Sequence, residues 1–235
     1  MLVDNTKFLS IRLGSSHAFF IPSKNGAIIV DAGNVHKITQ LKSVLHAHEH
    51  SLSEISYIIL THTHQDHVGS LVELKQRTGA KIIVHEKEAD YLRMGKTPLP
   101  KGVTFYAKTI VAIGKMTRFG AYPPIGPDIL VTHRLDLSDI GIDGYILHTP
   151  GHTEGSMSVV LKSGVAFIGD TMFNIQPDTV FPPFANDTRL LLQSWRLLLE
   201  TGCNIFYPSH GKPIEVEKFR RCLLRRERKI KGKKS

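Results

Sequence analysis

The chain is poor in cysteine and in long apolar runs, and each shortage excludes a class of protein. It has two cysteines, Cys203 and Cys222, in 235 residues, too few for the disulfide framework of a small secreted domain. No apolar run approaches the ~20 residues that a helix needs to span a bilayer. The first residues carry an acid, Asp4, and no apolar core segment, so they are unlike a signal peptide. We therefore expect a cytoplasmic protein with no membrane partner.

Net charge is also missing from most of the chain. The whole sequence carries +9, but residues 218–235 contain ten basic residues and a single acid, Glu227. Residues 1–217 hold 20 basic and 20 acidic side chains, which cancel. We expect a single domain over residues 1–217 and a basic C-terminal tail over 218–235. Such a tail is typical of a solvated, partly helical end, and it could also bind nucleic acid.

What the chain does have is a cluster of histidines next to a carboxylate. The cluster follows the apolar run 55–60, which predicts a buried strand. Its members are His62, His64, Asp66 and His67. The first two histidines are two residues apart, so on an extended backbone they point to the same side. Imidazoles and a carboxylate without a thiolate suit zinc or a similar divalent ion, so we predict a metal site where this strand ends.

Apolar runs and helical patterns alternate along the chain, which indicates an α/β architecture. The pair Asn25-Gly26 between two apolar runs predicts a hairpin. Residues 70–73 fit a capping box at the start of a helix that Gly79 ends. A further helix is expected over 105–118, and the loop after it, rich in proline and glycine, is interpreted as a pocket wall or a surface excursion.

The second half again places polar residues at the ends of apolar strands. His152 lies in a Pro-Gly turn after a strand. Asp170 ends the apolar strand expected over 165–170. His210 follows a strand expected over 203–207, and Asp31 ends an early strand in the same way. Strand ends are where α/β folds present chemistry. Four of them, at the 62–67 cluster, His152, Asp170 and His210, deliver metal-binding residue types.

Other histidines form a rival candidate. His46 and His50 lie one helical turn apart and could hold a metal together. The alternative interpretation is an exposed helix end, where the dipole favours positive charge. His85 and His148 fall within or beside strands and are interpreted as packed structural residues.

Taken in order, the strand-end motifs resemble those of the metallo-β-lactamase superfamily. The resemblance extends from residues 30–33 to residues 209–211, which is nearly the whole chain. It implies a four-layer αββα sandwich, an α/β fold with the site at one edge of two facing sheets. It also implies two divalent metal ions, with Zn²⁺ preferred and Fe or Mn as alternatives.

The same resemblance implies a role for each candidate residue. The ligands of the first metal would be His62, His64 and His152. Those of the second would be Asp66, His67 and His210. The carboxylate of Asp170 would bridge both metals, and Asp31 would orient the loop without being a ligand.

The implied activity is metal-dependent hydrolysis. A hydroxide held by the two metals, from a water whose pKa falls to roughly 7, would attack the substrate. Asp66 would pass a proton to the leaving group. His67 directly after Asp66 resembles glyoxalase II enzymes and lactonases, so the expected substrate is a small ester, thioester or lactone. The segment 173–184, rich in proline and phenylalanine, is expected to form an apolar pocket rim or a stiffened loop.

Two other functions remain open from the sequence. A nucleic-acid phosphodiesterase of the same superfamily would use the basic residues 218–235 on the phosphate backbone. A persulfide dioxygenase, an oxidoreductase, shares much of the motif but uses a single iron ion. Metal analysis would separate a zinc hydrolase from a mononuclear iron oxygenase, and removal of residues 218–235 would test the phosphodiesterase. The sequence does not indicate an oligomeric state.

Overall fold

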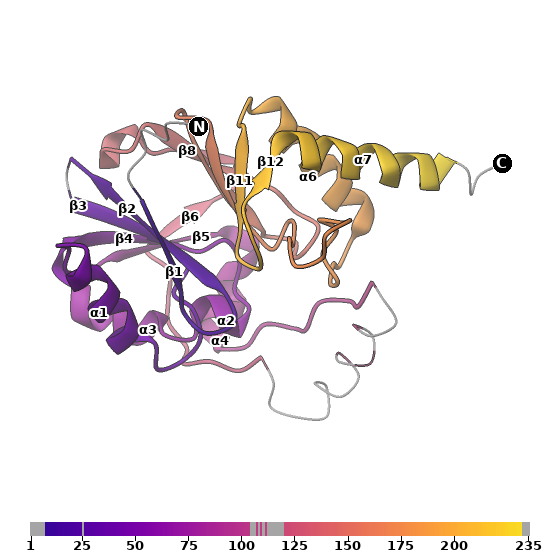
Figure 1. The fold of residues 1–235 in the computed structure, drawn as a ribbon. Coiled ribbons are helices and arrows are strands. Elements are labelled where there is room, and N and C mark those ends of the chain that lie inside the picture. The colour runs from indigo at the N-terminus through magenta and orange to yellow at the C-terminus, as the bar shows by residue number, and fades with distance from the viewer. Residues whose placement is uncertain are drawn as a thin grey trace.

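The computed structural model describes residues 8–24, 26–103, 107, 109, 111 and 120–231. Across these residues, two six-stranded sheets face each other and helices cover their outer faces (Figure 1). The predicted α/β class and four-layer αββα sandwich are confirmed. Within the same residues, no helix is both long enough and apolar enough to cross a membrane.

The first sheet holds the N-terminal strands in sequence order. They are β1 (Leu9–Arg12), β2 (His17–Ser23), β3 (Gly26–Val30), β4 (Ile55–Ile59), β5 (Lys81–His85) and β6 (Ile129–Val131). The first three pair antiparallel, and β3 to β6 run parallel. Parallel strands end at the same edge of a sheet. At the ends of β3 and β4, the backbone N–H of Asp31 donates to the carbonyl of Ile59 at 2.9 Å.

The second sheet is built from the C-terminal strands in the order β12-β11-β10-β9-β8-β7. Their bounds are β7 (Arg134–Asp136), β8 (Gly144–His148), β9 (Met157–Leu161), β10 (Val165–Gly169), β11 (Ile205–Pro208) and β12 (Ile214–Glu215). Among these neighbours, β10 and β11 pair parallel and the others pair antiparallel. Gly169 pairs with Pro208, so the residues after these two strands also emerge at one edge.

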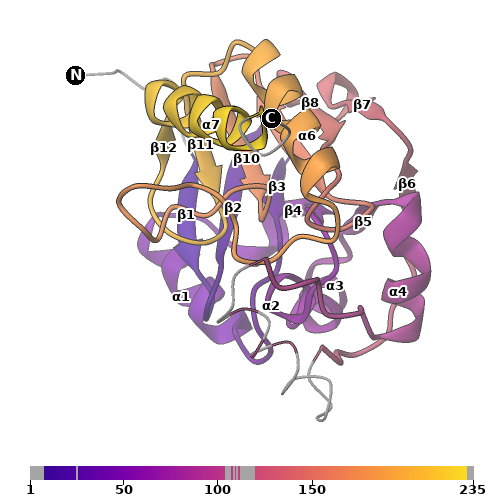
Figure 2. The ribbon, with the colours of Figure 1, turned by 90° about the vertical axis from the view of Figure 1, so that its right-hand side faces the viewer.

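Helices close the sandwich on both sides (Figure 2). The described helices are α1 (Ile38–Ala47), α2 (Gln65–Val68), α3 (Leu71–Thr78), α4 (Ala89–Met94), α6 (Thr188–Glu200) and α7 (Val216–Lys231). The described residues also form three short 3-10 turns, η1 (Leu52–Glu54), η2 (Glu86–Glu88) and η3 (Ser138–Ile140). Helices α1 and α3 lie on the first sheet, and α6 and α7 lie on the second.

Three layers of buried apolar side chains hold the four layers together. The central one fills the space between the sheets, where the rings of Phe19 and Phe167 have centroids 4.7 Å apart. On the outer face of the first sheet, Leu41 packs in a cluster with other buried aliphatic residues. On the outer face of the second, Trp195 and Phe219 meet edge to face at 5.3 Å. The sheets are therefore buried on both faces, as their apolar sequences predict.

Some local predictions need correction or cannot be compared. The capping box at 70–73 is wrong, because the hydroxyl of Ser70 donates to the carbonyl of Asn34 and leaves the helix end uncapped by a side chain. The strand expected over 203–207 begins at Ile205, although Cys203 is buried in the core as expected. Asn25 of the predicted hairpin, and nearly all of the helix expected over 105–118, lie outside the described residues.

The basic segment near the C-terminus forms most of α7. Two of its apolar side chains, Phe219 and Leu223, are one turn apart and buried against the second sheet. Glu227, the acid among the basic residues, pairs with Arg196 of α6. The first turns of α7 are thus packed on the sandwich, and its later turns extend beyond the second sheet (Figure 1).

Candidate metal centre

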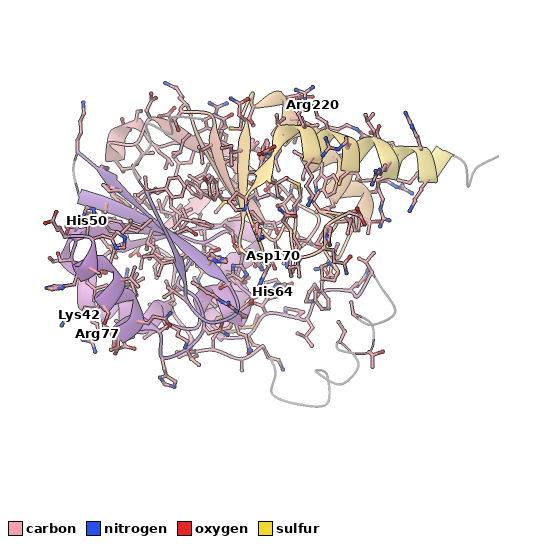
Figure 3. All side chains as sticks on the ribbon, viewed as in Figure 1. Lys42, His50, His64, Arg77, Asp170 and Arg220 are labelled. Atoms are coloured by element: carbon pink, nitrogen blue, oxygen red, sulfur yellow. The ribbon has the colours of Figure 1, made fainter. Side chains whose placement is uncertain are left out.

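The seven predicted ligands converge at the edge where the strands end. They are His62, His64, Asp66, His67, His152, Asp170 and His210. All seven fall into three overlapping groups of three residues. Within each group the ligand atoms lie within 4.8 Å of one another. His64 follows a strand of the first sheet and Asp170 a strand of the second, and the two are labelled close together in Figure 3. The edge shared by the two sheets is therefore where the candidate ligands meet.

The first group consists of His62, His64 and His152, and its rings are held from behind. The Nδ1 of His152 lies 3.0 Å from the carbonyl oxygen of Phe184, and the Nε2 of His64 lies 3.3 Å from that of Pro98. A ring N–H that donates to a carbonyl leaves the other nitrogen with a free lone pair. Those two other nitrogens, of His64 and His152, are 3.0 Å apart. If each ring donates to its carbonyl, two lone pairs face each other at this distance, an arrangement that a cation against both would stabilise.

Burial keeps the first group neutral. It lowers the pKa of His62, His64 and His152, and the pKa of His152 falls to about 4. At neutral pH each of these imidazoles is therefore uncharged, and one of its two nitrogens has a lone pair and no proton. That is the protonation state in which histidine binds a metal.

Asp170 faces both halves of the centre with different oxygens. Its Oδ2 lies 3.9 Å from His62 and 3.5 Å from His152. Its Oδ1 lies 3.5 Å from the Nε2 of His67 and 3.4 Å from that of His210. Burial opposes ionisation of this carboxyl, but the histidines beside Oδ1 outweigh it and hold its pKa well below the usual range. Asp170 is thus an ionised carboxylate placed between two groups of histidines.

The second group consists of Asp66, His67 and His210 and strongly favours positive charge. Burial opposes protonation of His67, but Asp31 and the other nearby carboxylates raise its pKa well above 6.5. The same balance raises the pKa of His210 to about 10, with Asp170 as the main cause. Burial likewise opposes ionisation of Asp66, whose pKa the two histidines nevertheless lower. Carboxylates and imidazoles that attract positive charge this strongly fit a divalent cation.

Three buried ligand atoms point into the centre without a hydrogen bond. In the described part of the chain, the Nε2 of His62, the Nε2 of His67 and the Oδ1 of Asp170 have no hydrogen-bond partner. Native proteins rarely leave buried polar atoms in this state, and an ion is one of the standard explanations. These residues therefore fit a metal on the chemistry of their donors and on the orphaned atoms they turn inward.

Asp31 supports the cluster from behind, as the sequence predicts. It is fully buried, and its Oδ1 accepts from the backbone N–H of Thr61 at 2.8 Å. Its Oδ2 accepts from the Thr61 hydroxyl and lies 2.8 Å from the Nδ1 of His67. Asp31 also adopts φ +64°, a strained conformation for a residue other than glycine. One carboxylate thus fixes both the start of the cluster and the orientation of a ring within it.

Glu88 gives a second support that the sequence analysis missed. This carboxylate is fully buried, and it accepts from the backbone N–H and the hydroxyl of Thr63. Its other oxygen accepts from the backbone N–H of Gly155 at 3.2 Å. A Cβ at position 155 would lie 2.5 Å from the Glu88 side chain, so only glycine fits there. Glu88 therefore joins the loop of His62 and His64 to the loop of His152.

Ser15 is the other contributor that sequence reasoning missed. Its carbonyl lies 3.0 Å from the Nδ1 of His210, and its hydroxyl donates to Asp66 at 3.3 Å. Ser15 belongs to a turn far from either residue in the sequence, and nothing in that turn marks it. Glu88 has no mark either, because it stands two residues after another acid, Glu86, in a charged stretch. Both roles depend on tertiary contacts.

A cavity of about 440 Å³ opens onto the centre. Its apolar wall comes from Leu99, Val111, Phe173 and Phe184, and candidate ligands form its floor. The ring of Phe173 stacks on His210, with centroids 4.5 Å apart. Both ends of the segment 173–184 thus line the cavity, in keeping with the expected apolar rim.

The remaining histidines do not join the centre. His46 lies exposed near the end of α1, and the ring of His50 pairs with Glu54, so the rival candidate has no shared ligand geometry among the described residues. The ring of His85 stacks on that of His148 at 3.9 Å. Both nitrogens of His85 are used in hydrogen bonds to the backbone. The structural interpretation of these two residues is confirmed.

Fold and ligand pattern agree with one family of proteins. The sequence pattern described as "Metallo-beta-lactamase superfamily" matches residues 11–210. The chain belongs to this superfamily.

Relatives and solved structures of the same kind resemble the chain. A "Beta-lactamase-like protein 2 homolog" of Drosophila melanogaster is 26% identical over 88% of this chain and 62% of its own length. A "Hydroxyacylglutathione hydrolase GloC" of Haemophilus influenzae is 30% identical over 64% of this chain and 62% of its own. The chain thus spans less than two thirds of either relative. The crystal structure of "TTHA1623 in a di-iron-bound form" has the same fold, with a TM-score of 0.68 and 19% identity over 91% of this chain and 98% of that one.

Proposed function

We propose that the chain is a metal-dependent hydrolase with a dinuclear centre. The observation that carries the proposal is the placement of Asp170, whose two oxygens face two separate groups of buried ligand atoms. The nitrogens of His64 and His152 that lie 3.0 Å apart, each on a ring whose other nitrogen faces a backbone carbonyl, add a reason for a cation in the first group. Membership of the superfamily supports the same reading.

Each metal has a proposed set of ligands. The first would be held by His62, His64 and His152. The second would be held by Asp66, His67 and His210. Asp170 would bind both, and Asp31 would orient His67 through its Nδ1. When bound, two divalent ions supply a nucleophilic water of lowered pKa and positive charge for the oxygen of the reacting group.

Asp66 is the proposed proton carrier. Its side chain is 23% exposed and lines the cavity, so a substrate can reach it. The hydroxyl of Ser15 donates to its Oδ2 and fixes the orientation of the carboxylate. Because its pKa is lowered, Asp66 is ionised at neutral pH. One of its carboxylate oxygens can therefore accept a proton and then donate that proton to the leaving group.

The cavity favours a small substrate with an apolar part beside the bond that breaks. Leu99, Val111, Phe173 and Phe184 would receive that part, and the candidate ligands would face the reacting carbonyl. Esters, thioesters and lactones all meet this description. The hydroxyacylglutathione hydrolase among the relatives supports the thioester in this group.

Zinc is the proposed metal, with iron and manganese as the alternatives. Imidazole and carboxylate donors suit all three ions. The fold is shared with a protein seen in a di-iron-bound form, so the donor set alone does not exclude iron. The metal must therefore be measured together with the activity.

The test begins with the purified full chain. Its metals are removed with a chelator, their loss is confirmed by elemental analysis, and the chain is reloaded with Zn²⁺, Fe²⁺ or Mn²⁺. Hydrolysis is then measured on a panel of esters, thioesters, lactones and phosphodiesters, with oxygen consumption on a persulfide in parallel. We expect hydrolysis of one carbonyl substrate class that is lost with the metal and restored with two ions per chain.

Other outcomes of that experiment would overturn the proposal. If the metal-free protein and the reloaded protein are both inactive on every substrate of the panel, the proposed hydrolase activity is wrong. Oxygen consumption with one iron ion per chain and no hydrolysis would identify a mononuclear iron oxidoreductase. Cleavage of phosphodiesters alone would identify a nucleic-acid phosphodiesterase.

A further inference from the structure

A second cavity lies outside the metal centre, between α7 and the segment 173–184. Its volume is about 280 Å³. Phe181 and Trp195 supply aromatic surface, and Arg225, Arg226 and Lys229 of α7 supply three positive charges. None of the candidate metal ligands lines it. It is therefore a separate site on the outer side of the second sheet.

The three cations of this cavity are not neutralised by the protein. In the described part of the chain, Arg225, Arg226 and Lys229 make no ion pair, although Asp178 also lines the cavity. The nearby acid Glu227 is already engaged by Arg196. Arg225 and Lys229 are four residues apart on a helix, a spacing at which like charges repel. The cavity thus concentrates positive charge that a bound anion would relieve.

Arg226 is held in a fixed position within the cavity. Its guanidinium lies over the ring of Phe181, 3.6 Å from the ring centroid. The residue is half-buried, and this burial lowers the pKa of its guanidinium. A partly desolvated guanidinium that is already oriented loses little entropy when it binds a ligand.

The geometry points to a site for a phosphate-bearing small molecule, with the phosphate on Arg225, Arg226 and Lys229. The planar fork of arginine matches phosphate oxygens, and lysine adds a point charge beside it. Phosphate presents several oxygens to several cations at once, which a single carboxylate does less well. The hydroxyl of Thr179, which also lines the cavity, can donate to another oxygen.

The segment 173–184 connects this site to the metal cavity. Its two ends line the metal cavity, whereas Phe181 lines the phosphate site. The segment is also tied to α7, because the ammonium of Lys218 donates to the side chain of Asn174 at 2.6 Å. A ligand in the phosphate site would therefore contact the middle of a segment whose two ends line the metal cavity.

The test is a calorimetric titration of the full chain with inorganic pyrophosphate at physiological salt. The first variant is Arg225→Gln with Lys229→Gln, which removes two exposed charges, and the second is Arg226→Gln. The matched control is Arg220→Gln, since Arg220 is an exposed arginine of the same helix that does not line the cavity (Figure 3). Thermal unfolding checks that each variant is folded.

We expect one pyrophosphate site that weakens about tenfold or more in both cavity variants and changes less than about twofold in the control. Pyrophosphate bound at the metal centre would be recognised because it persists in all variants. The proposal is overturned if the titrations of the four proteins are the same. Single-stranded oligonucleotides are titrated in parallel. The proposal is also overturned if they alone bind and if Arg220→Gln weakens their binding as much as the cavity variants do, because that result describes a general basic surface. These readouts do not need turnover, so they stand or fall independently of the proposed hydrolase activity.

Discussion

The two groups of the metal centre differ in how deeply they lie. In the first group His62 and His152 are each 1% exposed and His64 is 9% exposed, whereas in the second group Asp66 and His210 are 23% and 13% exposed and His67 is fully buried. The buried group is held from behind by backbone carbonyls, and Glu88 joins its two loops. Members of both groups line the substrate cavity, and the more exposed, open group is oriented in part by Ser15, from a turn.

This contrast assigns different tasks to the two groups. A buried, oriented set of neutral imidazoles loses little freedom when it binds an ion, so the first metal should bind tightly. The open group contains the proposed proton carrier, Asp66, and should exchange its metal more readily. The predictions below follow from this division, in order of decreasing effect.

The largest effect is expected for Asp170→Asn, because Asp170 faces both groups. An amide keeps one acceptor oxygen but turns N–H groups toward the other metal position. Metal content should fall below two ions per chain, and kcat/KM should fall about a thousandfold or more. Elemental analysis and hydrolysis assays measure the two quantities.

Asp143→Asn is the matched control for this substitution. Asp143 is an exposed aspartate that pairs with Lys162 far from the centre. Its replacement should leave metal content and turnover unchanged. Full metal occupancy with normal turnover in Asp170→Asn would contradict the bridging role.

The next prediction compares His152→Gln with His210→Gln. The first substitution removes a buried ligand and should lower the affinity for the tight metal. The second removes an exposed ligand and should leave about one ion bound per chain, with turnover strongly reduced in both variants. Equal loss of both ions in the two variants, measured by elemental analysis after dialysis, would remove the distinction between a buried and an open group.

Glu88→Gln tests how the buried group is organised. Gln can keep the bonds of one carboxylate oxygen but not those of both, so one of the two loops is released. Metal affinity should fall about 10- to 100-fold, as is typical when a partner behind a ligand is lost. Glu86→Gln, at an exposed acid two residues away, is the control. If both variants retain the affinity of the unmodified chain, Glu88 has no positioning role.

The smallest effect is expected for Phe173→Leu on the open side. The substitution keeps an apolar wall but removes the ring that stacks on His210. We expect kcat/KM to fall about two- to tenfold, while metal content remains unchanged. A loss of metal in this variant would show that the ring supports the ligand itself.

The residues alone predicted the α/β class and a metal site at the strand ends, and the resemblance to a family added the four-layer sandwich. Apolar strands are legible from composition, and polar residues directly after them stand at a shared edge, as His62 and Asp170 do. The supports were less legible. Glu88 and Ser15 act through contacts with residues distant in sequence, so no local pattern distinguishes them from surface residues.

Two further differences have the same physical origin. Ser70 has the sequence of a helix cap, but a tertiary contact with Asn34 recruits its hydroxyl. In α7, the dense positive charge hides Phe219 and Leu223, which anchor the helix on the second sheet. In both places, packing decided between options that the local sequence left open.

The proposed centre holds two metals of unequal affinity in one chain. The metal-free full chain is titrated with Zn²⁺. Calorimetry records the binding of the ions, and hydrolysis of the best substrate is measured as they bind. We predict two ions per chain bound in two steps, with the stronger step lost in His152→Gln and activity appearing only as the second step fills. A chain that binds no metal at these residues, or that is fully active without it, would contradict the account.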